Sequence, residues 1–274
     1  MARRVGIVGY GSLGRHLVSQ IENDRRFELA FVWNRTVSKM EGRVDPEHIL
    51  LDLDHFASRQ PDLVVEVAHP SITKAHGAEF LKHCDFLIGS PSALCDEALF
   101  TDLKRSALIH GLYVPSGAFW GAEDVRKLSE AGKLKSLHVT MKKHPLSLKL
   151  RGNLKEKNAR VTDDAVVLYD GPIRELCDLA PNNVNTMAVA AVAAPDLGFD
   201  GIRGTLVADP KLVHSHVVEI EACGFPKDDG SGFRVRTVRE NPAVLGEVTG
   251  EATYAAYFGS LARAKSKGSG VHLC

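Results

Sequence analysis

The sequence predicts an α/β protein in which a doubly wound parallel sheet is followed by a second α+β domain with an open, mostly antiparallel sheet. Three observations support this prediction. A β-branched apolar run at 5–8 leads directly into a Gly-x-Gly-x-x-Gly motif at 9–14. Strand-like apolar runs then alternate with helical patterns, which is typical of parallel sheets with crossover helices. From residue 136 onward, strand-like runs alternate apolar and polar residues, as half-buried antiparallel strands do.

The first strand, at 5–8, is followed by an amphipathic helix whose apolar positions begin at Leu13. The first glycine of the motif permits a sharp exit from the strand, the second lets backbone approach a pyrophosphate, and the third lets the helix pack closely. Amides at the helix start attract phosphates. Because a strand precedes the motif and a helix follows, we predict a Rossmann-type dinucleotide site rather than a purely structural turn. The predicted cofactor contacts in this turn are Gly9, Gly11, Ser12, Leu13 and Gly14.

The second strand, at 28–33, ends at Asn34 and Arg35. An acidic residue at this place would bind the ribose 2′-hydroxyl of NAD, whereas an arginine can pair with the 2′-phosphate of NADP. Asn34 stands where the acidic residue would be, so NAD and NADP both remain possible cofactors. A solvated loop is the alternative interpretation of Arg35.

Three further strand-like runs complete the first domain, which we expect to span residues 1–120. Ligands bind beyond the carboxyl ends of such strands, and the residues there are small, among them Ala68 and Ala118. We therefore add Ala68 to the predicted cofactor contacts. The expected strands are 62–68, 86–90 and 112–118, the expected helices are 75–83 and 96–105, and a connecting segment with a short helix is expected at 45–59.

The second domain is expected to span residues 121–242. Asn182 or Asn183 is predicted to cap an alanine-rich helix that Pro195 ends, and the polar segment 153–163 is predicted to be a loop. A last helix lies within 243–265 and is expected to pack back on the first domain, and 266–274 is expected to be a flexible tail. The other expected helices are 122–131 and 172–179, and the expected strands are 136–145, 165–169, 204–210, 213–222 and 233–239.

Composition narrows the class of protein. The 274 residues carry 34 Lys and Arg against 34 Asp and Glu, so no net charge favours nucleic acid or a membrane surface. No apolar run reaches the roughly 20 residues that a membrane span needs, and no signal-peptide pattern opens the chain. The five cysteines are scattered without metal-ligand spacing. We therefore expect a cytoplasmic protein without a metal site.

A few polar residues in the second domain could carry chemistry. His214 and His216 are two residues apart in a predicted strand, so they should share one face. A histidine is the usual acid–base group near neutral pH, and the alternative is a partly solvated pair at the strand end. Lys142 and Lys143 end another strand and could bind a substrate carboxylate, although a solvated strand end would explain them too. Capping accounts for only one asparagine before the alanine-rich helix, so Asn183 or Asn185 could contact a ligand.

Taken together, these segments resemble the L-aspartate dehydrogenase family, and most of all its animal members. The glycine motif is shared by many dehydrogenases, whereas Asn-Val-Asn at a helix start, followed by Asp-Pro and then His, is more specific. The matching segments run in family order over nearly the whole chain and are 5–14, 64–68, 114–118, 180–185 and 208–210 with Ser215-His216.

The resemblance implies a nicotinamide-binding first domain and a second domain used for catalysis and subunit contact, hence a homodimer. It implies NAD(P)-dependent oxidative deamination of L-aspartate to oxaloacetate and ammonia through iminosuccinate, and the reverse amination. Ala118 and Asn185 match cofactor-contacting residues of the family, with Asn183 as the alternative to Asn185, and His216 matches its active-site histidine. The family usually has Asn where this chain has His214, which puts activity or aspartate preference in question.

The mechanistic hypothesis places aspartate between the domains, with Lys142 or Lys143 binding its carboxylates and His216 acting as general base. Two alternatives stay open. One is an NAD(P)-dependent oxidoreductase acting on another amino or keto acid, which the glycine motif supports equally. The other is a non-catalytic dinucleotide-binding protein, which His214 and the missing ribose carboxylate would suit.

Overall fold

The computed structural model describes residues 2–265 and 267–274 and divides into two compact units. Unit 1 comprises Met1–Pro115, Tyr257–His272 and Cys274, and unit 2 comprises Ser116–Ala256 and Leu273. The sequence analysis placed the domain boundaries at 120/121 and 242/243. The division by contacts falls instead at 115/116 and inside the last helix.

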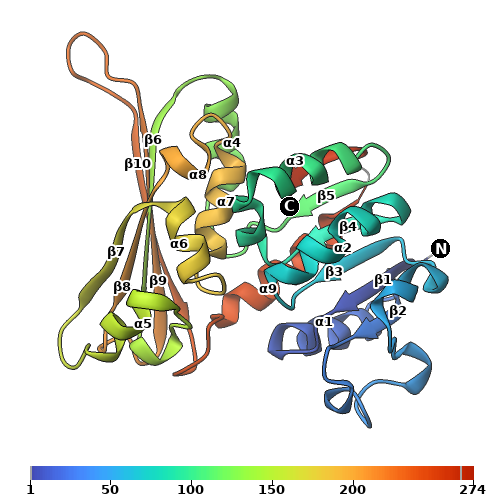
Figure 1. Ribbon diagram of the computed structural model, residues 1–274. Helices are drawn as coiled ribbons and strands as arrows, with labels where there is room; N and C mark the ends of the chain where they lie inside the picture. The colour runs from blue at the N-terminus through green and yellow to red at the C-terminus, as the bar shows by residue number, and fades with distance from the viewer. Residues whose placement is uncertain (1, 266) are drawn as a thin grey trace. The chain divides into compact units, whose positions relative to one another are not determined.

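Unit 1 is built on a six-stranded sheet in the order β11-β5-β4-β3-β1-β2, in which β1 to β5 are parallel (Figure 1). The chain moves from β1 to β2 on one side and then to β3 on the other, so the strand order reverses beside β1. Ligands of doubly wound sheets bind at such a switch point. The predicted Rossmann-type sheet is confirmed. Its strands are β1 (Arg3–Val8), β2 (Phe27–Trp33), β3 (Leu63–Glu66), β4 (Asp85–Ile88), β5 (Gly111–Val114) and β11 (Gly270–Leu273).

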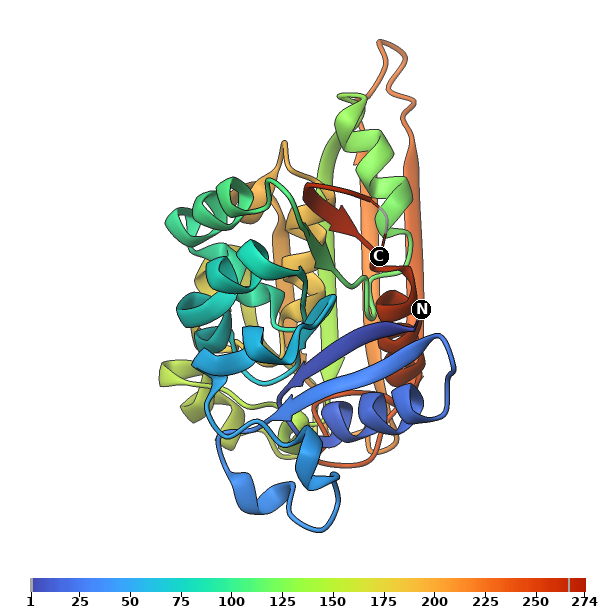
Figure 2. The same cartoon turned by 90° about the vertical axis from the view of Figure 1, so that its right-hand side faces the viewer.

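Helices cover both faces of this sheet because the strands are apolar on both sides. On one face, Leu17 and Ile21 of the first helix and Leu261 of the last helix share a buried cluster with Ile7 and Val65. Figure 2 shows the first helix against β1 and β2. The helices of the unit are α1 (Ser12–Glu22), α2 (Pro70–His83), α3 (Glu97–Ser106) and the part of α9 (Glu251–Arg263) from Tyr257 onward, with short 3₁₀ turns at Val37–Lys39, Pro46–His48, Leu53–Arg59 and Pro91–Cys95.

The C-terminal residues correct one expectation. Residues 266–274 were expected to form a flexible tail, but β11 joins the edge of the sheet beside β5. The amide of Gly270 donates to the Ala107 carbonyl at 2.8 Å, and the amide of Cys274 donates to the Val114 carbonyl at 3.1 Å. The prediction is therefore wrong for the strand, while Ser266 lies outside the described residues.

Unit 2 is built on a five-stranded mixed sheet in the order β10-β9-β6-β8-β7, in which only the β6–β8 pair is parallel among the described strands. The mostly antiparallel sheet is thus as predicted. Figure 2 shows the loop between β9 and β10 extending beyond the rest of this sheet. The strands are β6 (Leu134–Lys143), β7 (Val166–Pro172), β8 (Arg203–Ala208), β9 (Ser215–Gly224) and β10 (Arg234–Pro242).

Helices lie along one face of this sheet (Figure 1). Alternate residues of β6 and β9 are buried, as the period-two pattern predicted. The alanine-rich helix α7 is buried on all sides from Thr186 to Ala193. The helices are α4 (Ala122–Glu130), α5 (Gly152–Ala159), α6 (Ile173–Leu179), α7 (Asn185–Ala193), α8 (Gly198–Gly201) and the start of α9, with a 3₁₀ turn at Pro145–Ser147.

Two local expectations in this part of the chain are wrong. The segment 153–163 is not all loop, because α5 occupies its first half and buries Leu154. The N-cap of α7 is Val184, so neither Asn182 nor Asn183 caps it. The last helix, Glu251–Arg263, lies within the expected range 243–265, and residues 243–250 form a loop before it. In the described residues, no helix is both long enough and apolar enough to cross a membrane.

Candidate functional site

The glycine turn between β1 and α1 has the shape that dinucleotide binding requires. Gly9 has a φ of 112°, which a side chain would strain, and a Cβ at Gly14 would collide with the Gly9 carbonyl. A Cβ at Gly11, by contrast, would have no atom within 4 Å. The turn therefore keeps open space above Gly11, and the first amides of α1 have no carbonyl of their own helix to bind. Both features suit a bound pyrophosphate.

Asn34 holds this turn in place. Its Oδ1 accepts a hydrogen bond from the Tyr10 amide at 3.1 Å, and its Nδ2 donates to the Thr36 carbonyl at 2.9 Å. The amide thus ties the end of β2 to the glycine turn. Arg35 is exposed next to it. Their contacts with a cofactor, like that of Ala68, stay predictions.

A buried carboxylate at the carboxyl end of β3 was missed by the sequence analysis. Glu66 is fully buried, and its oxygens accept hydrogen bonds from the amides of Ala68 at 2.7 Å, His69 at 2.8 Å and Ser90 at 3.0 Å. It therefore joins the loops that follow β3 and β4. Burial raises the pKa of Glu66 to about 7, although the donors around it act in the opposite direction. A charged residue inside the apolar run 63–67 was the available signal.

In unit 2, three buried polar residues lie side by side on the inner face of the sheet. Asn241 of β10 is paired with His216 of β9. The β6–β9 register pairs Lys142 with Val217, and one step further it brings Lys143 opposite His216. His216 and Lys143 are each only 4% exposed, and Asn241 is 3% exposed. This row of Asn241, His216 and Lys143 is the candidate catalytic site of unit 2.

The histidine of this row is held in a form that can accept a proton. Its ring hydrogen-bonds to the backbone of Glu247, and within the described residues its buried Nε2 has no partner. The bond to Glu247 therefore comes from Nδ1, which leaves the lone pair on Nε2. Burial first, and then the charge of Lys143, lowers the pKa of His216 to about 4. The ring is therefore neutral at pH 7 with its Nε2 lone pair available, while burial and Lys143 make it a weaker base than an imidazole in water.

The lysine of the row is a buried cation. Its Nζ donates to the Val248 carbonyl at 2.8 Å, and no carboxylate pairs with it in the part of the chain that the structure describes. Burial lowers the pKa of Lys143 to about 8, so the amine is mostly charged at pH 7. A buried ammonium without a counter-ion is costly. It is therefore suited to a substrate carboxylate.

The loop 243–250 covers this row with its backbone. The carbonyls of Glu247 and Val248 accept from His216 and Lys143, and the amide of Gly246 donates to the Ser147 Oγ at 3.1 Å. Asn241 fixes the far end of the loop, because its Oδ1 accepts from the Ala252 amide at 3.1 Å. Neither Asn241 nor the loop carried a signal that the sequence analysis could have used.

Other predicted residues lie elsewhere. Lys142 is on the opposite face of the sheet and forms an ion pair with Glu219. His214 is exposed and lies just before β9, so it does not join the buried row that contains His216. Asn183 is 1% exposed, and its amide is used to bind the Lys149 amide at 2.7 Å and the Ser147 carbonyl at 3.0 Å. These contacts give Asn183 a structural role.

Two predicted cofactor contacts lie in unit 2, one at the start of a helix and one in a turn. Asn185 is the first residue of α7 and is half-buried. Ala118 is half-buried in the segment after β5, where the preceding Gly117 carbonyl accepts a hydrogen bond from Arg239 at 2.9 Å. No group of three or more His, Cys, Asp or Glu side chains that could hold a metal ion occurs among the described residues.

Comparison with known proteins gives matches over the whole chain. Residues 124–260 match the family described as aspartate dehydrogenase, C-terminal, and residues 9–115 match the NAD-binding domain of homoserine dehydrogenase. The chain is 49% identical to an aspartate dehydrogenase domain-containing protein of Xenopus tropicalis, over 99% of this chain and 98% of that protein.

More distant matches agree. An L-aspartate dehydrogenase of Thermotoga maritima is 30% identical, over 79% of this chain and 81% of the relative. Among solved structures, the crystal structure of aspartate dehydrogenase from Thermotoga maritima superposes with a TM-score of 0.70 at 21% identity, covering 97% of this chain and 98% of that one. At that identity, the superposition shows that the fold is shared.

Proposed function

Because the chain belongs to the aspartate dehydrogenase family, whose members are oxidoreductases with an NAD-binding domain, we propose that it oxidatively deaminates L-aspartate. The products are oxaloacetate and ammonia, formed through iminosuccinate, and the reverse reaction is the amination of oxaloacetate. NAD or NADP is the cofactor. When bound, it supplies the acceptor for the hydride of the α-carbon.

The observation that carries the proposal is the unpartnered Nε2 of His216. A neutral imidazole whose Nδ1 is held by a backbone carbonyl presents a basic nitrogen in a fixed direction. We assign His216 the proton transfers of the reaction. Nε2 accepts a proton from the substrate ammonium before hydride transfer and releases it to solvent. It then accepts a proton from the water that attacks the imine and gives it to the departing amine.

Lys143 is assigned to the substrate carboxylate. Its ammonium is buried beside His216 and lacks an acidic partner within the described residues, so a carboxylate would offset the cost of its burial. Lys142, whose charge is already paired with Glu219, is the weaker candidate. In unit 1, the amides of Ser12, Leu13 and Gly14 would hold the pyrophosphate, with Gly9 and Gly11 giving the room that the turn needs.

The test is the variant His216→Gln assayed with L-aspartate, and with oxaloacetate and ammonia, using NAD and NADP in parallel. We expect kcat to fall by roughly 10²–10⁴-fold, as when an acid–base group is lost, with cofactor affinity unchanged. His214→Gln is the matched control and should keep most of the activity, since His214 is exposed. Equal kcat in wild-type and His216→Gln proteins would remove the assigned role.

The same assays separate the alternatives. If another amino acid or keto acid turns over faster than aspartate and oxaloacetate, the chain is a related dehydrogenase with a different substrate. If the cofactor binds but no substrate of the panel reacts, a non-catalytic dinucleotide-binding protein is the better description. The Glu247 and Val248 carbonyls that already engage His216 and Lys143 are the feature that would favour this last outcome.

We also propose a cytoplasmic homodimer. The support for the dimer is the face of the unit 2 sheet that carries Lys142 and Glu219, where Val238 is 62% exposed. The support for the cytoplasm is the balanced charge and the scattered cysteines. Light scattering of the purified protein tests the dimer, and a monomer at micromolar concentration would contradict it.

A further inference from the structure

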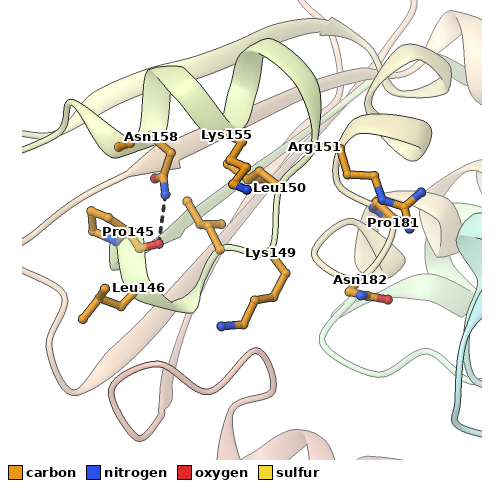
Figure 3. A pocket seen from close by; sticks show the side chains of 11 residues that line it. Pro145, Leu146, Lys149, Leu150, Arg151, Lys155, Asn158, Pro181 and Asn182 are labelled. Carbon is orange, nitrogen blue, oxygen red and sulfur yellow. Dashed lines mark hydrogen bonds between the residues drawn. The ribbon is translucent and has the colours of Figure 1, made fainter.

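A cavity of about 450 Å³ lies in unit 2 (Figure 3), and Asn241, His216 and Lys143 are not among the described residues that line it. Its walls are the segment after β6, the helix α5 and the residues just before α7. Three cations line it, namely Lys149, Arg151 and Lys155, and none of its eleven described lining residues is acidic. Six of the eleven are apolar, including Leu148 and Leu150.

The charge and the apolar surface of this lining indicate what kind of ligand the cavity would bind. Three positive side chains around one hollow attract an anion with more than one negative charge. The amide of Asn182 adds a polar group at the rim, while the apolar walls favour a ligand that has carbon groups to bury. We propose that this cavity binds a small organic polyanion, a di- or tricarboxylate, at a site separate from the proposed catalytic one.

The cavity is tied to the catalytic row by a chain of hydrogen bonds within unit 2. The wall residue Lys149 donates its amide to Asn183, whose Nδ2 donates to the Ser147 carbonyl. Ser147 in turn accepts from the Gly246 amide, in the loop whose next two carbonyls hold His216 and Lys143. An anion that fixes the wall therefore also fixes the 243–250 loop. This gives the site a regulatory role.

The experiment measures citrate binding to the full chain by isothermal titration calorimetry. The wild type is compared with Lys149→Ala/Lys155→Ala and with the control Lys133→Ala/Lys135→Ala, whose exposed lysines lie at the other end of β6. Both double variants lose two charges from the same unit. We expect the cavity variant to bind citrate at least about fivefold more weakly, with the control unchanged. Inorganic phosphate should bind more weakly than citrate.

Citrate binding to the variant Lys143→Met distinguishes this site from the catalytic one, and the measurement does not depend on enzymatic activity. If citrate affinity falls in Lys143→Met and not in the cavity variant, the anion occupies the catalytic row and the proposal is wrong. Absence of citrate binding to the wild type, or equal binding to both double variants, would also overturn it. Phosphate binding as tight as citrate would refute the organic ligand. Saturating citrate should slow hydrogen exchange at the Gly246 amide, and unchanged exchange would refute the coupling.

Discussion

Burying His216 and Lys143 costs free energy of folding, and no acidic partner among the described residues offsets that cost. The pKa of each is lowered, which favours the neutral form, and neither has an acidic partner among the described residues. Residues of this kind cluster at functional sites, because a site tuned for binding or proton transfer is rarely optimal for stability. That reasoning separates Lys143 from Lys142, whose neighbour Glu219 lowers the cost of its charge.

Replacing Lys143 with Met should therefore make the protein more stable and weaken its binding of substrate. We expect Lys143→Met to raise the free energy of unfolding by about 0.5–2 kcal/mol, because a buried unpaired charge is removed. The KM for aspartate should rise at least about tenfold, because the substrate carboxylate loses its cation. Urea denaturation and steady-state kinetics measure the two effects.

Lys142→Met is the matched control on the opposite face of the same strand. It should leave the KM unchanged and alter the free energy of unfolding by no more than about 1 kcal/mol, since a partly exposed pair contributes little. If the two variants raised KM equally, the site would not lie on the inner face of the sheet.

The sequence identified some residues of the candidate site and not others, and the difference has a physical cause. His216 was singled out by the resemblance to the family's active-site histidine, because strand alternation alone gave His214 and His216 together. Asn183 was misassigned because its amide binds Ser147 and Lys149, more than thirty residues away, and no local pattern encodes such a contact. The role of Asn241 depends on its register with β9, which is likewise set by the tertiary fold.

Among the helices and strands, those with a clear pattern of apolar residues were predicted, and those without such a pattern were missed. The parallel strands β1 to β5 are short apolar runs next to turn residues, so their pattern is clear. The helix α5 was missed because it is polar and buries little besides Leu154. The strand β11 was missed because Gly270–Leu273 is not a continuous apolar run, and its partner β5 lies about 160 residues earlier in the chain.

The start of α1 gives a test in which two glycines should behave differently. Gly11 has an ordinary φ of −78° and open space where a Cβ would point, so Gly11→Ala should change the free energy of unfolding by less than about 1 kcal/mol. The methyl would nevertheless fill the space left for the pyrophosphate. We expect the Kd for NAD to rise at least about tenfold, measured by fluorescence titration.

Gly14→Ala is the contrasting variant. Its methyl would meet the Gly9 carbonyl, so the turn must shift and the free energy of unfolding should fall by about 1–3 kcal/mol. A Gly11→Ala protein that binds NAD as tightly as the wild type would show that no phosphate approaches this backbone.

For the whole molecule, the buried titratable groups of the two units respond to pH in opposite directions. In unit 1, burial raises the pKa of Glu66 to about 7, above its usual 4.5, so folding stabilises the protonated form. That contribution is fully present below about pH 4.5 and is lost as the pH rises toward 7. In unit 2, the pKa of His216 is lowered to about 4, below its usual 6.5. Its contribution is present above about pH 6.5 and is lost as the pH falls toward 4.

Lowering the pH from 7 to 5 should therefore stabilise unit 1 and destabilise unit 2, each by about 1–2 kcal/mol. Hydrogen exchange read as protection factors can follow the two sheets separately, with amides of β3 and β4 reporting on unit 1 and amides of β6 and β9 on unit 2. Glu66→Gln should abolish the change in the first set and leave the second, whereas His216→Gln should do the reverse. Protection that moves in the same direction in both sheets, or that persists in these variants, would mean that other groups control the pH response.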